Sequence, residues 1–261
     1  MSPATYPVRV HQPDRMSAIL DRLAESGSVS VAQTASDLDV SEATIRRDLE
    51  RLEEQRLLTR IHGGAVAQSV LYELPLRYRS ARHQDEKLRI ARATVERLFD
   101  AQSIGLTGGT TTSEVARALV ERSRITVVTN ALNIASELAV RPNIKLVLTG
   151  GVARAESYEL VGPLAEQTLA SLNLDVVVVG ADGIDLAAGL TTHHEVEAHT
   201  NAALIGRARR VIVAADSSKL GHAAFAQICP LSAVNELVTD VGAPRAIVEA
   251  LREQGIDVTT V

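Results

Sequence analysis

The chain has 261 residues, of which 46% are hydrophobic and 23% are charged, and this composition is typical of a globular protein. Its 27 Lys and Arg against 32 Asp and Glu exclude a protein that is basic overall but leave room for a local nucleic-acid surface. With four Tyr, two Phe and no Trp, a single-strand binder that stacks bases on aromatic side chains is not expected.

The N-terminal residues, the apolar runs and the cysteine content indicate the cellular compartment. No apolar run approaches the roughly 20 residues that a membrane span needs. Residues 1–13 lack the apolar centre of a signal peptide, so we expect them to form a flexible tail. Cys229 is the single cysteine and cannot form an internal disulfide or a metal cluster. We therefore expect a cytoplasmic protein with no membrane association, no metal and no cofactor.

Residues 14–68 carry the pattern of three short helices followed by a hairpin. Apolar residues from Met16 to Leu23 recur at helical spacing, and a second helix is expected after Ser30. Ser41 is a good N-cap for a third helix that runs to about Gln55. The alternating stretch LLTRIHGGAV then turns at two glycines, which predicts a two-stranded wing.

The third helix separates an apolar side from a basic side. Ile45, Leu49 and Leu52 fall on one side, and Arg47 and Arg51 lie roughly opposite. A helix-turn-helix presents such a surface to the major groove, where Arg pairs with guanine or phosphate. The plainer interpretation is a solvated charged helix. The candidate DNA contacts on this helix and the wing are Ser41, Thr44, Arg46, Arg47, Arg51, Arg60 and His62.

The stretch SEATIRRDLERLEEQRLLTRIHGGA resembles the DNA-binding signature of the DeoR family of bacterial transcription regulators. That signature has a Ser, then TIRRDL, then a Leu, then RxHGGA. The sequence departs from it at Gln55 and Arg56, where a glycine is common. The resemblance implies a winged helix-turn-helix that binds operator DNA.

Residues 69–92 are charged and helical in pattern and are expected to link this domain to residues 93–261. In the second domain, β-rich runs alternate with helices, and some runs, such as Val176 to Val179, are entirely apolar. This pattern predicts an α/β fold with a Rossmann-like parallel sheet. The expected strands lie near 103–107, 125–130, 145–150, 175–182, 210–216, 236–240 and 257–261.

Polar residues or glycines follow nearly every expected strand, where parallel sheets bind their ligands. In GLTGGTTTSEV, two glycines and three threonines precede a helix and could hold a phosphate, although a simple glycine turn with a Thr cap has the same pattern. Carboxylates, amides and a lysine follow other strands and suit a phosphorylated sugar or polyol. The candidate effector contacts are Gly109, Thr110, Thr111, Thr112, Thr129, Asn130, Gly150, Gly151, Asp182, Glu197 and Lys219.

The second half is also similar to the DeoR family, whose effector domain is related to ribose-5-phosphate isomerase. The motifs that carry this likeness are GLTGGTTT, VTNALNIASEL, VGADGID and ADSSKLG. The resemblance implies sensing of a phosphorylated sugar, and it adds Lys87, which matches a phosphate-contacting lysine of the isomerase. Many members have Asp-Ser-Gly at Thr107–Gly109 and a lysine at Asn201, so the ligand itself stays open.

Three functions remain: a ligand-responsive regulator, an isomerase with a DNA-binding appendage, and a scaffold protein. An isomerase needs a base, for which Asp182 or Glu197 would serve. However, Val179 stands where the isomerase pattern has a second Asp, and GLTT lacks that pattern's lysine. We therefore expect no enzyme activity. We expect instead a repressor, acting as a dimer or tetramer, whose DNA binding is modulated by a phosphorylated sugar.

Overall fold

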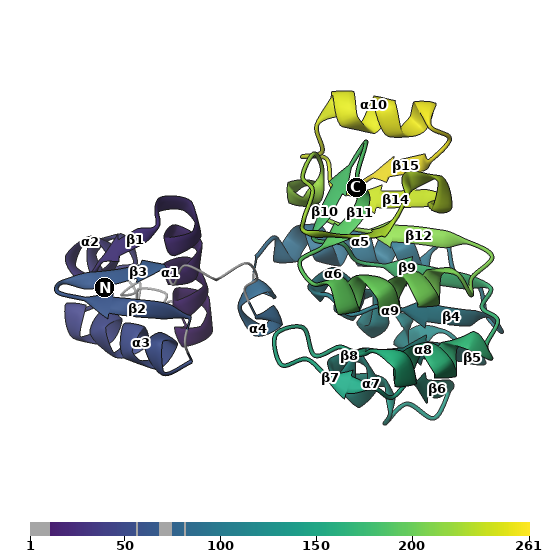
Figure 1. Cartoon of the computed structure of the whole chain (residues 1–261), viewed down its shortest axis with the longest axis horizontal. Coiled ribbons are helices and arrows are strands. Elements are labelled where there is room, and N and C mark those ends of the chain that lie inside the picture. Colours follow the sequence, from purple (N-terminus) through teal and green to yellow (C-terminus); the bar gives the residue numbers. More distant parts are fainter. Residues whose placement is uncertain (1–10, 56, 68–74, 81) are drawn as a thin grey trace, which may run out of the picture. The chain divides into compact units, whose positions relative to one another are not determined.

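The computed structural model describes residues 11–55, 57–67, 75–80 and 82–261 (Figure 1). Residues 1–10 of the expected tail lie outside this range, and the first helix already begins at Gln12. The chain divides into two compact units, residues 1–82 and 83–261, and each is described by itself. The range 69–92, expected as a linker, is thus shared between the two units.

The N-terminal unit contains three helices and a small antiparallel sheet. The helices are α1 (Gln12–Ser26), α2 (Val31–Asp37) and α3 (Glu42–Glu54), and a short α4 (Leu76–Arg79) follows later. Strands β1 (Ser28–Ser30), β2 (Leu58–Ile61) and β3 (Gly64–Ala67) pair in the order β1-β3-β2. The wing expected with two strands therefore has a third, because three residues before α2 are extended and bury Val29 under the hairpin.

Two adjacent glycines shape the wing for different reasons. Gly63 has φ +78° and makes the turn between β2 and β3. Gly64 lies so close to β1 that a Cβ there would stand 2.0 Å from the carbonyl oxygen of Val29. The first glycine is therefore required by backbone conformation and the second by the close approach of another strand.

The C-terminal unit is built on a sheet of seven parallel strands. In spatial order these are β15 (Asp257–Thr260), β14 (Glu236–Thr239), β12 (Val211–Ala214), β9 (Val176–Val179), β4 (Ser103–Leu106), β5 (Ile125–Thr129) and β6 (Ile144–Leu148). Every strand of the predicted sheet is present. The predicted fold class, a winged helix-turn-helix with a Rossmann-like α/β domain, is confirmed.

Helices cover both faces of this sheet. One apolar core includes side chains from α5 (Gln84–Val95), α6 (Thr110–Ala118) and α7 (Leu132–Leu138) together with Val176 and Val178 of β9. The other includes side chains from α8 (Pro163–Ala170), α9 (Glu195–Ile205) and α10 (Arg245–Glu253) together with Val177 and Val179. In Figure 1, α8 and α9 lie in front of the sheet and α5 lies behind it. Burial on both sides explains the uninterrupted apolar strand.

Shorter strands that the sequence pattern did not predict surround the main sheet. A hairpin of β7 (Val152–Ala153) and β8 (Leu160–Val161) follows β6. A separate antiparallel sheet is formed by β10 (Gly183–Asp185), β11 (Gly189–Thr192) and β13 (Ala226–Cys229). The chain order along the main sheet reverses between β4 and β9, which is the place where such sheets leave a crevice for a ligand.

Candidate functional site

A buried ion pair holds the third helix of the N-terminal unit against the first. Asp48 on α3 is 1% exposed, and its carboxylate accepts hydrogen bonds from Arg15 Nε at 2.5 Å and Arg15 Nη2 at 3.1 Å. Gln12 Nε2 adds a third bond at 3.2 Å. The aspartate of the TIRRDL motif is thus a structural residue that fixes α3 on α1, a role that the helical pattern did not reveal.

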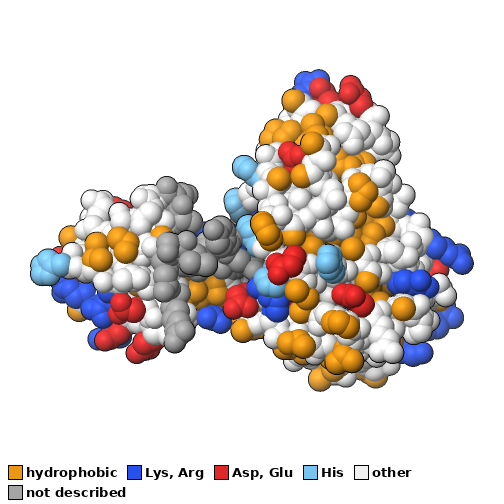
Figure 2. Space-filling view, viewed as in Figure 1, with side chains coloured by type: hydrophobic (Ala, Val, Ile, Leu, Met, Phe, Trp, Pro, Cys, Tyr) orange, Lys and Arg blue, Asp and Glu red, His pale blue; other side chains and the backbone are white. Residues whose placement is uncertain are grey.

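The opposite side of α3 carries the arginines expected to contact DNA. Ser41 caps the helix by accepting a hydrogen bond from the Thr44 amide at 3.2 Å. Arg47 and Arg51 are exposed, and no acidic side chain in the described part of the chain lies within ion-pair distance of either. Arg46 is exposed but pairs with Glu42 at 2.5 Å. Figure 2 shows such basic and acidic side chains next to one another on this unit.

The wing residues differ in their surroundings. The Arg60 amide donates to Glu53 Oε1 at 2.9 Å, and its guanidinium lies 3.8 Å from the carboxylates of Glu50 and Glu53. His62 is exposed beside the turn at Gly63. The acidic residues at the end of α3 therefore contact strand β2 of the wing.

In the C-terminal unit, the switch point of the sheet, between β4 and β9, lies beside the expected phosphate loop. Helix α6 begins at Thr110 after Gly109, whose φ of +128° favours glycine. The hydroxyls of Thr112 and Ser113 donate to the Gly109 carbonyl at 3.1 and 2.7 Å. Thr107 Oγ1 accepts from the Gly180 amide at 3.0 Å and joins this loop to the one after β9. The first amides of a helix have no partner within that helix, so those of α6 are suited to binding an anion.

The β7–β8 hairpin brings unexpected polar residues to the same end of the sheet. It is fixed beside β5 because Leu160 N donates to the Asn130 carbonyl at 2.7 Å and Leu132 N donates to the Tyr158 carbonyl at 2.9 Å. Tyr158 has φ +60°, an uncommon conformation for a residue with a side chain. The hairpin carries Arg154, Ser157 and Glu159, none of which the sequence pattern singled out.

Three carboxyl groups, which we call the carboxylate cluster, meet at this hairpin: Asp182, Glu197 and Glu159. Glu197 pairs with Arg154 at 2.8 Å and accepts a hydrogen bond from Ser157. The hydroxyl oxygen of Thr192 lies between two of the acids, 3.0 Å from Asp182 Oδ2 and 3.3 Å from Glu197 Oε2. Asp182 is half-buried, whereas Glu197 and Glu159 are buried, so Asp182 lies at the outer edge of the cluster.

Burial, and then the nearby carboxylate of Glu197, raise the pKa of Glu159 from 4.5 to about 8. Asn201 Nδ2, which donates to Glu159 Oε2 at 3.3 Å, partly opposes that rise. Asn201 in turn accepts from Asn130 Nδ2 at 3.2 Å. Glu159 is therefore mostly neutral at pH 7, and a chain of amides connects it to the end of β5.

The remaining expected effector residues have varied positions. Thr129 ends β5, and its hydroxyl donates to the Leu106 carbonyl at 2.8 Å. Gly150 and Gly151, with φ of +73° and +122°, turn the chain into the β7–β8 hairpin. Lys87 is 3% exposed on α5, and half-buried Lys219 ends a short helical turn after β12. Thr111 is buried on the first turn of α6.

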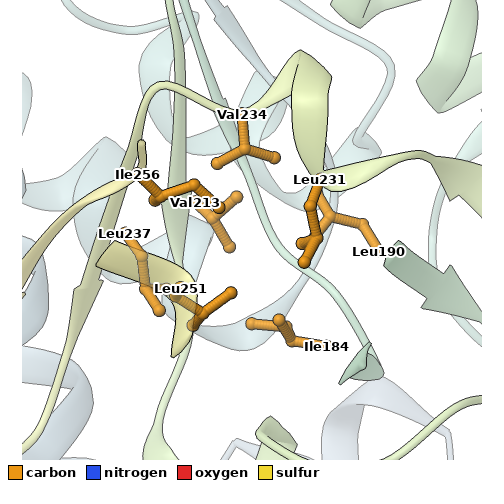
Figure 3. Close-up of a pocket in the computed structure, with 8 residues that line it drawn as sticks. All are labelled: Ile184, Leu190, Val213, Leu231, Val234, Leu237, Leu251 and Ile256. Carbon is orange, nitrogen blue, oxygen red and sulfur yellow. The ribbon is translucent and has the colours of Figure 1, made fainter. Parts of the chain in front are cut away.

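A small apolar cavity lies elsewhere in the C-terminal unit (Figure 3). It measures about 10 Å³, and its lining side chains are all aliphatic, among them Leu190, Val213 and Leu251. A cavity of this size and polarity is too small for a sugar phosphate. It is a packing defect beneath α10 and not a candidate for the effector site.

Neither a metal site nor a membrane span is found within the described ranges. No group of three or more His, Cys, Asp or Glu side chains there could hold a metal ion. None of the helices described is both long enough and apolar enough to cross a membrane.

A winged helix-turn-helix followed by a parallel α/β unit with a polar site at its switch point defines a transcription regulator with a sensor domain. The model of the DeoR-like helix-turn-helix domain matches residues 15–70, and that of the DeoR C-terminal sensor domain matches residues 82–241. The chain belongs to the DeoR family of transcription regulators.

Curated relatives extend over nearly the whole chain. The glycerol-3-phosphate regulon repressor of Escherichia coli K12 is 33% identical over 94% of this chain and 97% of its own length. The HTH-type transcriptional regulator GlpR of Haloferax volcanii is 37% identical over 87% of this chain and 89% of its own. Ribose 5-phosphate isomerase A of Methanocaldococcus jannaschii is 22% identical over 53% of this chain and 55% of its own, with a TM-score of 0.40.

The two named regulators confirm that this chain is a transcription regulator and not an enzyme. Val179, at the position where the isomerase pattern has an aspartate, is fully buried in β9. Glu197, considered above as a base, is paired with Arg154 and Ser157.

Proposed function

We propose that the protein is a cytoplasmic repressor that binds its operator as a dimer or tetramer and is released by a phosphorylated sugar or polyol. The exposed Arg47 and Arg51 on the capped helix α3 carry the DNA part of this proposal. Two copies are needed because one short recognition helix reads only a half-site. Arg46, Ser41, Thr44, Arg60 and His62 would add contacts at the edges of the groove.

The effector part of the proposal is supported by the crevice beside β4. The loop from Gly109 to Thr112 offers amides and hydroxyls to a phosphate, and Lys87 and Lys219 would supply the positive charge. Asn130, Asp182 and Glu197 would contact hydroxyls, and Thr129, Gly150 and Gly151 would shape the walls. The name of one relative, a glycerol-3-phosphate regulon repressor, is consistent with a phosphorylated effector.

Fluorescence anisotropy with labelled DNA from upstream of the protein's own gene tests both parts. We expect binding that saturates, that falls steeply with salt because phosphates are neutralised, and that one member of a sugar-phosphate panel weakens. Equal binding to scrambled DNA would contradict the operator assignment. Sedimentation of the free protein, and of its complex with the operator, would give the number of copies.

A further inference from the structure

The phosphate loop and Glu159 touch each other directly. A Cβ on residue 108 would stand 2.3 Å from Glu159 Oε1 and 2.5 Å from its Cγ, so any residue other than glycine there would displace this carboxyl group. The Gly108 amide also donates a hydrogen bond to the carboxyl group. Glu159 therefore lies immediately beside the first residues of the loop that would hold a phosphate.

Within the described residues, both hydrogen bonds to the Glu159 oxygens, from Gly108 and Asn201, come from donors. Neither contact can take a proton from the carboxylic acid form of Glu159. That form carries an O–H group, which needs an acceptor when it is buried. A second polar group then has to complete the site.

The side chain of Asn130 has the opposite need, because its oxygen lacks a hydrogen-bond donor among the described residues. Its side chain is 1% exposed, and its Nδ2 donates toward Glu159 through Asn201. Its Oδ1 is buried and has no hydrogen-bond partner in the described part of the chain. A buried acceptor without a donor is costly, and in a binding site a ligand supplies the missing group.

We propose that Glu159 and Asn130 form a hydroxyl subsite beside the phosphate loop, which selects a phosphorylated sugar or polyol over a phosphorylated sugar acid. This inference rests on the proposed function and names a specificity residue within its effector site. A hydroxyl group can accept from Glu159 and donate to Asn130, whereas an ionised carboxylate can only accept. A carboxylate there would also face Glu197 and Asp182, whose like charges repel it.

Calorimetry with three matched probes tests the subsite: fructose 6-phosphate, glucitol 6-phosphate and gluconate 6-phosphate, titrated into the full-length wild-type protein and into Glu159→Ala and Glu159→Gln. For the wild type, we expect the sugar or alditol phosphate to bind at least about tenfold more tightly than the aldonate phosphate. Glu159→Ala should lose most of that ratio. Glu159→Gln should keep it, because the amide is neutral and still donates. Glu253→Ala, an exposed change on α10, is the matched control.

Two results have distinct meanings. If none of the phosphates binds the wild type, both the sugar-phosphate part of the proposed function and this subsite are wrong. If the phosphates bind and Glu159→Ala leaves their affinity ratio unchanged, the subsite alone is wrong.

The pH dependence of binding keeps the test decisive if Glu159→Ala does not fold. The affinity of the wild type for glucitol 6-phosphate should fall as the pH rises through about 8, where Glu159 loses its proton. Glu159→Gln should show no fall near pH 8, although the other charged groups assigned to the site remain in both proteins: Glu197, Asp182, Arg154, Lys87 and Lys219. The same profile in both proteins would overturn the assignment.

Discussion

The arginines on the recognition helix and the wing differ in whether they already pair with an acidic side chain of the protein. Arg46 and Arg60 are engaged with acidic side chains of their own unit, at 2.5 Å and at 3.8 Å. Arg47 and Arg51 are exposed, on the side of α3 opposite buried Ile45 and Leu49. A DNA phosphate or base would therefore meet Arg47 and Arg51 without first breaking an ion pair.

Arg47→Ala should weaken operator binding by about 1–3 kcal/mol per half-site and leave the fold intact, because the side chain is exposed. Anisotropy titrations at fixed salt would measure this loss, and circular dichroism would check the fold. Glu54→Ala, an exposed change at the far end of the same helix, serves as the control. Unchanged affinity in Arg47→Ala would remove this residue from the interface.

Glu159 should make the stability of the C-terminal unit depend on pH. Its pKa is about 8 in the folded protein against the usual 4.5, so between these values the native state holds a proton that the unfolded chain releases. The contribution of Glu159 to the free energy of unfolding is greatest below pH 4.5 and falls as the pH rises to about 8. Above that pH it no longer changes, because Glu159 is ionised in both states. The free energy of unfolding, measured with urea, should fall more between pH 5.5 and pH 8.5 for the wild type than for Glu159→Gln. Equal losses would show that Glu159 ionises normally.

At the scale of elements, two contacts determine how the recognition helix is presented. The Asp48–Arg15 pair fixes α3 on α1, and the β1–β3 pairing fixes the wing beside α2. Both are contacts between segments that are far apart in the sequence. We expect each to respond strongly to a conservative change.

Asp48→Asn should destabilise the N-terminal unit by about 3 kcal/mol or more, because it removes the buried carboxylate that pairs with the nearly buried Arg15. Glu50→Gln, an exposed change on the same helix, should have a small effect. Thermal unfolding of the full-length protein would separate the two variants. Similar melting temperatures for the two variants would mean that the buried pair contributes little to the stability of the N-terminal unit.

Gly64→Ala should separate β1 from the wing, since the new methyl group would lie 2.0 Å from the Val29 carbonyl oxygen. The cost of such overpacking is about 1–3 kcal/mol and can be larger against backbone. Gly63→Asn is the matched control, because asparagine tolerates the positive φ there and meets no atom within 4 Å. Melting temperatures should rank wild type, Gly63→Asn and Gly64→Ala in that order. Equal temperatures for the two variants would refute the steric account.

At the scale of the whole molecule, helix α5 directly follows the boundary between the two units. Its first residue, Gln84, donates a side-chain hydrogen bond to Glu114 Oε1 at 3.0 Å. Glu114 is 7% exposed on α6, two residues after the proposed phosphate contact Thr112. An effector that moves the start of α6 can therefore act on the helix that leads to the DNA-binding unit.

Gln84→Ala and Lys87→Ala should weaken the effect of the effector on operator affinity more than they weaken operator binding itself. Coupling between two such sites is typically about 1–3 kcal/mol, or roughly 5–150-fold in affinity. The measurement is operator affinity with and without saturating effector, for both variants and for the exposed control Arg89→Ala. If the effector changes the operator affinity of Gln84→Ala by the full wild-type factor, the contact between α5 and α6 does not transmit the signal. If it does so for Lys87→Ala, Lys87 is only a binding contact.

The sequence by itself determined the elements whose evidence is local. Apolar periodicity placed the seven strands and the recognition helix, because burial on one or both faces imposes that pattern on nearby residues. The sequence also predicted the loop after β4, since glycines and threonines in front of a helix are a local signal for a turn.

Only the tertiary structure decided which polar residues share a site. Glu159 and Arg154 lie on a hairpin whose strands are two residues long, too short to leave a periodic pattern. Their significance comes from contact with Glu197, Gly108 and Asn201, which are distant in the sequence. Likewise, nothing local distinguishes buried Asp48 from an exposed helix acid. A carboxyl group acquires its pKa and its role from the groups that folding places around it, and the positions of those groups are set by the packing of the whole domain.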